Sequence, residues 1–73
     1  MSAEDFLVEI GHDLGRSAEQ MQPIVDRVVH ENWFTTVDQL RSIPDEMLKD
    51  MKIPGAVVIK LREKLALVDA VPV

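Results

Sequence analysis

The chain has 73 residues, of which 47% are hydrophobic and 29% are charged, and its formal net charge is −5. This length allows one domain with a small core, and the apolar share favours a folded globule over a disordered chain. The absence of cysteine excludes a disulfide framework and a thiolate metal site. The acidic balance disfavours a nucleic-acid partner, because phosphates repel such a chain unless its cations gather on one face.

The first helix is predicted to begin after Ser2, whose spacing to Asp5 resembles a capping box. Gly11 is expected to weaken this helix, and Gly15 is expected to end it. Its apolar residues recur at helical spacing at Phe6, Leu7, Ile10 and Leu14.

A second helix is predicted after the capping box of Ser17 and Gln20. Pro23 leaves two alternatives: a short turn before a main helix that starts at Pro23, or one long helix that kinks there. The buried stripe of this helix is expected to comprise Ile24, Val25, Val28 and Val29.

Three more helices are predicted in the second half of the chain. Thr36 and Gln39 form a capping box around a short helix, and Pro44 fits the first position of the next helix, which ends near Lys52. A turn at residues 53–55 leads into a last helix that runs to about Val68. With no strand pattern, the sequence predicts a single all-α domain over residues 1–73, a compact bundle of five helices.

Residues 31–65 carry a distinctive spacing of apolar and charged residues, at Ile43, Asp45, Glu46, Leu48, Met51, Ile53, Lys60, Leu61 and Leu65. This order resembles the last three helices of the SAM (sterile alpha motif) domain family. There a short helix precedes Leu-Thr-Glu-Glu-x-Leu-x-x-Leu-Gly-Ile and a long helix with a Lys-Ile pair. Residues 31–34, Glu-Asn-Trp-Phe, also resemble the family's Glu-Asn-x-Ile/Phe segment.

The chain departs from the family pattern at four places. Pro44 stands in place of the capping Thr, and Lys52 in place of the Gly before Ile53. Residues 56–58 lack the family's Gly-His-Arg opening, and the first two helices occupy a longer interval than usual. The resemblance implies a SAM-like five-helix bundle that binds other proteins, often other SAM domains, and performs no catalysis.

The family commonly uses two contact surfaces, and the resemblance implies where they lie in this chain. One is at the start of the last helix, where Ile59 projects about 150° from the stripe of Val57, Leu61, Leu65 and Val68. We name its residues the last-helix surface: Lys52, Ala56, Ile59, Lys60, Glu63 and Leu67. The other, the acidic middle surface, comprises Asp38, Asp45, Glu46 and Asp50. Head-to-tail contact between the two surfaces of different copies would not close and would give chains.

Other chemistries find little support in the sequence. His30 and Glu31 begin like the zinc-protease motif HExxH, but Phe34 stands where the second histidine is required. The chain has neither the Asp-Ser-Leu segment of acyl carrier proteins nor a glycine-rich phosphate loop. We therefore expect no enzyme, no cofactor and no metal. Trp33 lies between two predicted helices, and its side chain is expected to be buried in the core.

The alternative function is a nucleic-acid-binding helical domain. Residues 53–55 resemble the turn of a helix-hairpin-helix, and Lys60 and Lys64 share one face of the next helix. Pro54 removes one backbone donor, however, and the net charge opposes binding, so we favour a protein partner, either a SAM-like domain or a second copy. Residues 1–10 lack a basic signal-peptide region, and no run reaches membrane-span length, so we expect a cytoplasmic protein with no membrane partner.

Overall fold

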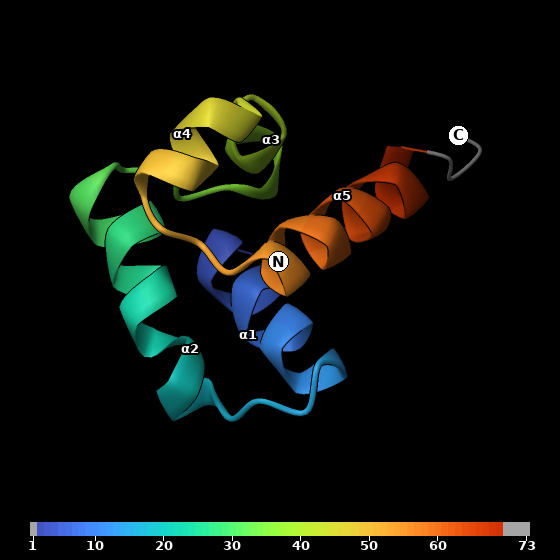
Figure 1. Ribbon diagram of the computed structural model, residues 1–73. Helices are drawn as coiled ribbons and strands as arrows, with labels where there is room; N and C mark the ends of the chain where they lie inside the picture. The colour runs from blue at the N-terminus through green and yellow to red at the C-terminus, as the bar shows by residue number, and fades with distance from the viewer. Residues whose placement is uncertain (1, 70–73) are drawn as a thin grey trace.

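The computed structural model describes residues 2–69 of the chain, with side chains up to residue 67. Within this range the chain forms five α-helices and no strand, which confirms the predicted all-α bundle. The helices are α1 (Ala3–Asp13), α2 (Ala18–Val25), α3 (Val37–Arg41), α4 (Asp45–Asp50) and α5 (Gly55–Asp69). A π-helix, η1 (Asp26–Glu31), continues α2. Figure 1 shows α3 and α4 beyond one end of the other helices, while the C-terminal part of α5 reaches away from the bundle.

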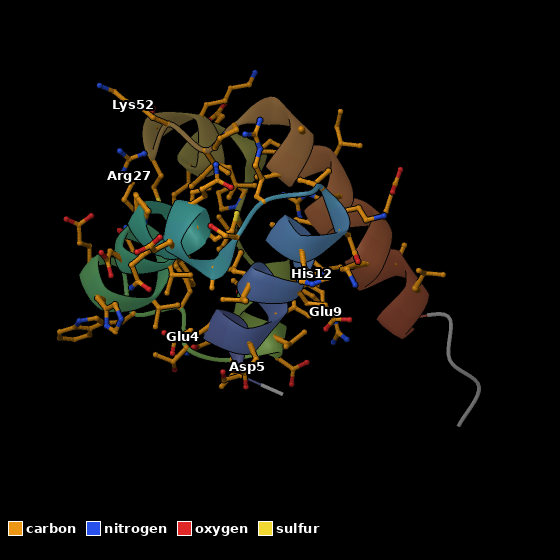
Figure 2. The ribbon with its side chains drawn as sticks, turned by 90° about the horizontal axis from the view of Figure 1, so that it is seen from below. Glu4, Asp5, Glu9, His12, Arg27 and Lys52 are labelled. Carbon is orange, nitrogen blue, oxygen red and sulfur yellow. The ribbon has the colours of Figure 1, made fainter. Side chains whose placement is uncertain are left out.

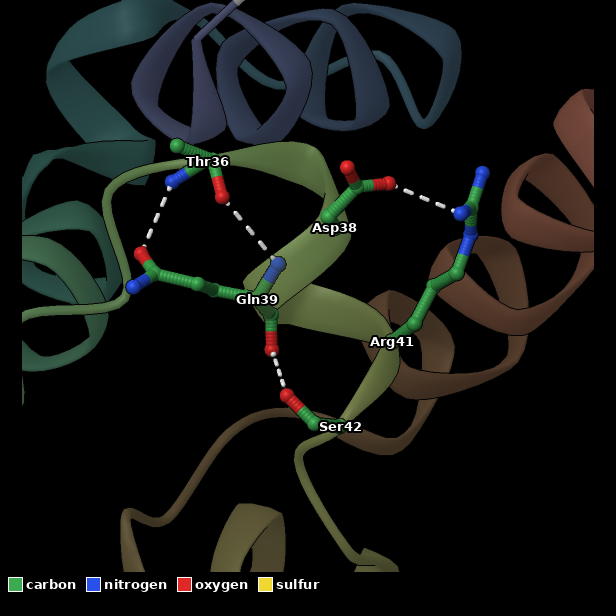
Figure 3. Close-up of polar contacts among 5 residues, drawn as sticks. All are labelled: Thr36, Asp38, Gln39, Arg41 and Ser42. Carbon is green, nitrogen blue, oxygen red and sulfur yellow. Dashed lines mark hydrogen bonds and ion pairs between the residues drawn. The ribbon is translucent and has the colours of Figure 1, made fainter.

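Side-chain caps start three of the helices, as predicted. Each cap is an oxygen that accepts a backbone N–H left open by the first turn, so the chain enters the helix at a defined residue. The caps are Ser2 on Asp5, the capping box of Ser17 and Gln20, and the capping box of Thr36 and Gln39. Figure 3 shows the last of these at the start of α3. Pro44 differs slightly from its prediction, because it is the N-cap of α4 rather than the first helical residue.

The long helix around Pro23 is continuous, which decides between the two sequence alternatives. α2 passes through Pro23 and widens into the π-helix three residues later. The side-chain amide of Asn32 donates to the carbonyl of Arg27 and satisfies one acceptor at the end of η1. Along this rod Ile24, Val25 and Val28 are buried, whereas Val29, the fourth residue of the predicted stripe, is only half-buried.

Three helical segments end at a residue in the left-handed region: Gly15 (φ 75°), Trp33 (φ 62°) and Lys52 (φ 58°). At the end of α4 the N–H of Lys52 donates to Lys49 O (2.9 Å), and the N–H of Ile53 donates to Leu48 O (3.1 Å). These two bonds form a Schellman motif, whose usual left-handed residue is glycine. Lys52 therefore carries strain that a glycine would not.

Trp33 is 78% exposed, so its predicted role in the core is wrong. The left-handed turn at the end of η1 leaves this side chain outside, and the following residue, Phe34, packs partly against the core instead. The N–H of Phe34 donates to Val28 O (3.0 Å), which holds this turn in place. A helical period cannot predict the outcome, because the corner interrupts the period at this residue.

The core is entirely apolar among the described side chains. Three residues of the predicted stripe of α5 are buried, Val57, Leu61 and Leu65, and the side chain of Val68 lies outside those described. α5 packs against α1. The other buried side chains come from the remaining helical segments and from the two connections that flank α4: Ala3, Phe6, Leu7, Ile10, Met21, Ile24, Val25, Val28, Leu40, Ile43, Leu48 and Ile53.

Gly11 lets α1 and α2 approach closely. A Cβ placed on Gly11 would overlap Met21 Cγ and would lie 2.7 Å from Met21 Sδ. Met21 is 1% exposed, so a displaced side chain would have to disturb its packing. Gly11 therefore stabilises the packing of α1 on α2, although it weakens α1 as an isolated helix.

Replacement of Gly11 by alanine is expected to destabilise the domain by about 1–2 kcal/mol. Overpacking costs about 1–3 kcal/mol, and the better helix propensity of alanine offsets about 1 kcal/mol of that. Urea unfolding at 25 °C measures the difference. The control is Gly55→Ala, since a Cβ at Gly55 meets nothing within 4 Å. Equal stability of the wild type and Gly11→Ala would show that the helices can separate at no cost.

The substitution Lys52→Gly is expected to stabilise the domain by about 0.5–1 kcal/mol. It removes a left-handed penalty of about 1–2 kcal/mol, against an entropic cost of about 0.5–1 kcal/mol for glycine. Thermal unfolding of dilute protein tests this. Lys49→Gly, inside α4, is the matched control and should be destabilising by about 1 kcal/mol. A destabilised Lys52→Gly would mean that the lysine side chain makes a contact worth more than the strain.

Candidate protein-interaction surfaces

The outward side of α5 carries exposed apolar residues, as the helical period predicts. Ile59 is 64% exposed and Leu67 is 69% exposed, while Ala56 and Glu63 are also exposed. Lys60 is half-buried, and its Nζ lies 3.9 Å from Glu63 Oε2. Five of the six residues of the last-helix surface therefore belong to one continuous side of one helix.

Lys52, the sixth residue, lies apart from that side. It occupies the left-handed corner after α4 and lines a hollow of about 410 Å³ together with Arg27, Glu31 and Asp50. Figure 2 shows Arg27 and Lys52 at the same edge of the molecule. Since Asp50 belongs to the acidic middle surface, the two predicted surfaces meet at this hollow.

Half of the acidic middle surface is paired within the chain. Asp38 Oδ1 accepts from Arg41 Nη1 at 2.8 Å, which Figure 3 shows on α3. Asp45 Oδ1 accepts from Arg62 Nη2 at 2.6 Å, and the same nitrogen donates to Ile43 O at 2.8 Å. Arg62 thereby joins α5 to the start of α4, so Asp45 has a structural role in addition to any binding role.

The other half of this surface is unpaired. Among residues 2–69, the side chains of Glu46 and Asp50 make neither an ion pair nor a hydrogen bond, and Met47 between them is 37% exposed. Glu46 lies in the first turn of α4, where a negative charge is favourable. Asp50 is the last residue of α4, where the helix dipole opposes a carboxylate by about 0.3–1 kcal/mol.

Arg27 holds the end of α4 against the long helical rod. Its Nη1 donates to the carbonyl oxygen of Met51 at 3.0 Å, and this carbonyl is at the C-cap of α4. A cation at this position satisfies an open acceptor and complements the helix dipole. Arg27 is half-buried and makes this contact, so Lys52 is the one exposed cation among the residues that line the hollow beside Asp50.

Lys64, which the nucleic-acid alternative requires, is bound to carboxylates of α1. Its Nζ lies 3.0 Å from Asp13 Oδ2 and 3.2 Å from Glu9 Oε1, and only 18% of its side chain is exposed. The hydrogen bond from Lys64 holds the pKa of Asp13 below its ordinary value, and the hydrogen bond to Asp13 raises the pKa of Lys64. This ion pair fastens α5 to α1 and leaves Lys64 little freedom to bind phosphate.

A groove that the sequence does not reveal lies where α1 ends and α2 and α5 begin. It has a volume of about 450 Å³. Its apolar lining comprises Leu14, Met21, Ile24 and Val57, and Arg16 and Gln20 supply its polar side. Ala56 of the last-helix surface also lines it. Three separate elements build this groove, and the only sequence signal is a lone arginine directly after Gly15.

The histidines occupy ordinary positions at helix ends. His12 and His30 lie in the last turns of α1 and η1, where a partial positive charge is favourable. His30 Nε2 is 3.9 Å from Asp26 Oδ1. In the described part of the chain, no three side chains of His, Cys, Asp or Glu are grouped to hold a metal ion.

Residues 2–69 include no helix with both the length and the apolar character that a membrane crossing requires. Comparison of the chain with protein-family models, with curated proteins and with solved structures finds no match. The surfaces described above are therefore the basis for inferring a function.

The pair of Asp13 and Lys64 is expected to make stability depend on pH at both extremes. Because the pKa of Asp13 is lowered in the folded state, its contribution is present above the ordinary value of 3.8 and is lost as the pH falls through the lowered pKa. The pKa of Lys64 is raised, so its contribution is complete below 10.5 and is lost as the pH rises through the raised pKa.

Urea unfolding of the wild type and Asp13→Asn from pH 7 down to pH 3 tests the acid side. The two should differ at pH 7 and converge as Asp13 is protonated. Asp50→Asn is the control, because Asp50 has no ion pair within the described residues. A difference that stays constant over this range would mean that the pair contributes nothing to folding.

Proposed function

We propose that the chain is a SAM-like helical domain that binds proteins without catalysing a reaction, and that it self-associates head to tail. The last-helix surface of one copy would contact the acidic middle surface of the next. The observation that carries the proposal is the exposure of Ile59 on α5, a helix whose opposite stripe fills the core. Ile59 with the neighbouring Lys60 offers an apolar side chain and a cation. The acidic middle surface offers the complement, because Met47 is exposed between the carboxylates of Glu46 and Asp50.

The backbone at Lys52 supports the likeness to the SAM family. The family has glycine before the isoleucine that follows its fourth helix, and here Lys52 occupies that position with φ 58°. A left-handed backbone explains why glycine is usual there. The departure at Lys52 therefore changes the residue without changing the conformation that the motif needs.

The availability of cations favours a protein partner over a nucleic acid. Lys64 and Arg62 are bound to carboxylates of the same chain, and Lys60 lies within 3.9 Å of Glu63. A phosphate backbone would have to compete with these contacts in a chain of net charge −5. A cytoplasmic location is part of the same proposal, because a chain without cysteine needs no oxidising compartment to fold.

Two single substitutions test the head-to-tail contact. Ile59→Asp should change the free energy of unfolding by no more than about 0.5 kcal/mol, since the side chain is exposed. It should nevertheless prevent association, because it places a carboxylate in an apolar contact. Asp50→Lys reverses the charge of the acidic middle surface at a residue with no internal ion pair, and it suits the dipole of α4 better than aspartate. Asp45→Lys is less informative, since it would also break the contact to Arg62.

Sedimentation velocity over a concentration series measures the outcome. The wild type should form chains, each mutant alone should be monomeric, and an equimolar mixture should give one dimer through the two intact surfaces. Glu4→Lys, on the outer side of α1, makes the same charge reversal away from both surfaces and should associate like the wild type. A wild type that stays monomeric at millimolar concentration, or an Ile59→Asp variant that unfolds, would refute the proposal.

A further inference from the structure

Trp33 combines strain with exposure. Its φ of 62° is unfavourable for a bulky side chain, and 78% of the residue is accessible. Contacts within its own chain therefore offset little of the free-energy cost of this backbone conformation. Strained backbone clusters at functional sites, and tryptophan is one of the residues enriched among the anchors of protein interfaces.

The groove at the start of α5 has the complementary properties. Leu14, Pro54 and Ala56 are at least partly exposed in it, its remaining apolar residues are buried, and Arg16 is the only charged residue that lines it. Arg16 is exposed and has no ion pair within residues 2–69. A suitable occupant is therefore a large apolar side chain accompanied by a carboxylate.

Trp33 and its neighbour Glu31 fit that description. Glu31 is exposed two residues before the tryptophan and also has no ion pair among the described residues. The charges of the two sites are thus opposite, Glu31 beside the ring and Arg16 beside the groove.

Trp33 does not occupy the groove of its own chain, since it is 78% exposed and is not among the lining residues. The groove includes Gln20 and Ile24 of α2, whereas Trp33 follows the far end of η1. At a rise of about 1.5 Å per residue, the rod separates them by roughly 13–20 Å, which exceeds the length of any side chain. Figure 1 shows the start of α2 and the end of η1 at opposite ends of the rod.

We propose that Trp33 of one copy inserts into the groove formed by the end of α1 and the starts of α2 and α5 in the next copy, with Glu31 pairing with Arg16. The inference rests on the proposed head-to-tail association and identifies its anchor. The two sites adjoin the two proposed surfaces, since Ala56 lines the groove and Glu31 shares a hollow with Asp50. Both contacts can therefore form in the same assembly.

Tryptophan fluorescence tests the insertion directly, because Trp33 is the only tryptophan. As the wild-type protein is concentrated, its emission should shift to the blue in step with association measured by sedimentation. Trp33→Gly removes the ring and the backbone strain together, so it should remain folded. It should weaken association by about 30-fold or more, as the loss of an interface anchor does.

Charge reversal tests the proposed pairing of Glu31 with Arg16. Arg16→Glu and Glu31→Arg should each weaken association, and the double variant Arg16→Glu/Glu31→Arg should recover it.

Wild-type protein that associates without a blue shift, or Trp33→Gly that associates normally, would overturn the insertion and leave the proposed function standing. Loss of association in Trp33→Gly but not in Ile59→Asp or Asp50→Lys would support the insertion and overturn the proposed surfaces. A wild type that never associates would overturn both.

Discussion

The close approach of α1 and α2 at Gly11 and Met21 determines how the rest of the domain is arranged. With no side chain on Gly11, Met21 can occupy the space beside α1, and the two helices pack against each other. α5 packs on α1. At the end of η1 the chain turns at Trp33 and leads to α3. The groove also depends on this approach, because Met21 forms part of its wall.

Much of the fold could be predicted because it is determined locally. Capping boxes at Ser17 and Thr36 and the apolar period of α5 are properties of a few neighbouring residues, and each is present in the structure. Trp33 and Gly11 could not be assigned in this way. The exposure of Trp33 follows from a left-handed corner, and the value of Gly11 follows from a side chain ten residues away on another helix.

The candidate surfaces also combine features that the local sequence predicts with features that only the fold reveals. The exposure of Ile59 follows from one helix and its period, so sequence alone predicts it. The pairing of Asp45 with Arg62 joins residues that are 17 positions apart, and the groove takes its residues from three elements. Neither can be seen without the fold. The structure therefore changes which carboxylates are available for a partner, and it adds an apolar recess that no motif indicates.

The packing of α5 on α1 also has a consequence for synthesis, because the first and last helices of the bundle are neighbours. As the chain leaves the ribosome, α1 and α2 can pair early, whereas the side of α1 that packs on α5 stays uncovered until α5 has emerged. The groove and the outer side of α5 come into existence only at that last step. A nascent chain therefore cannot present its recess to a finished copy before translation has passed α5, whereas Trp33 and the acidic middle surface are synthesised earlier.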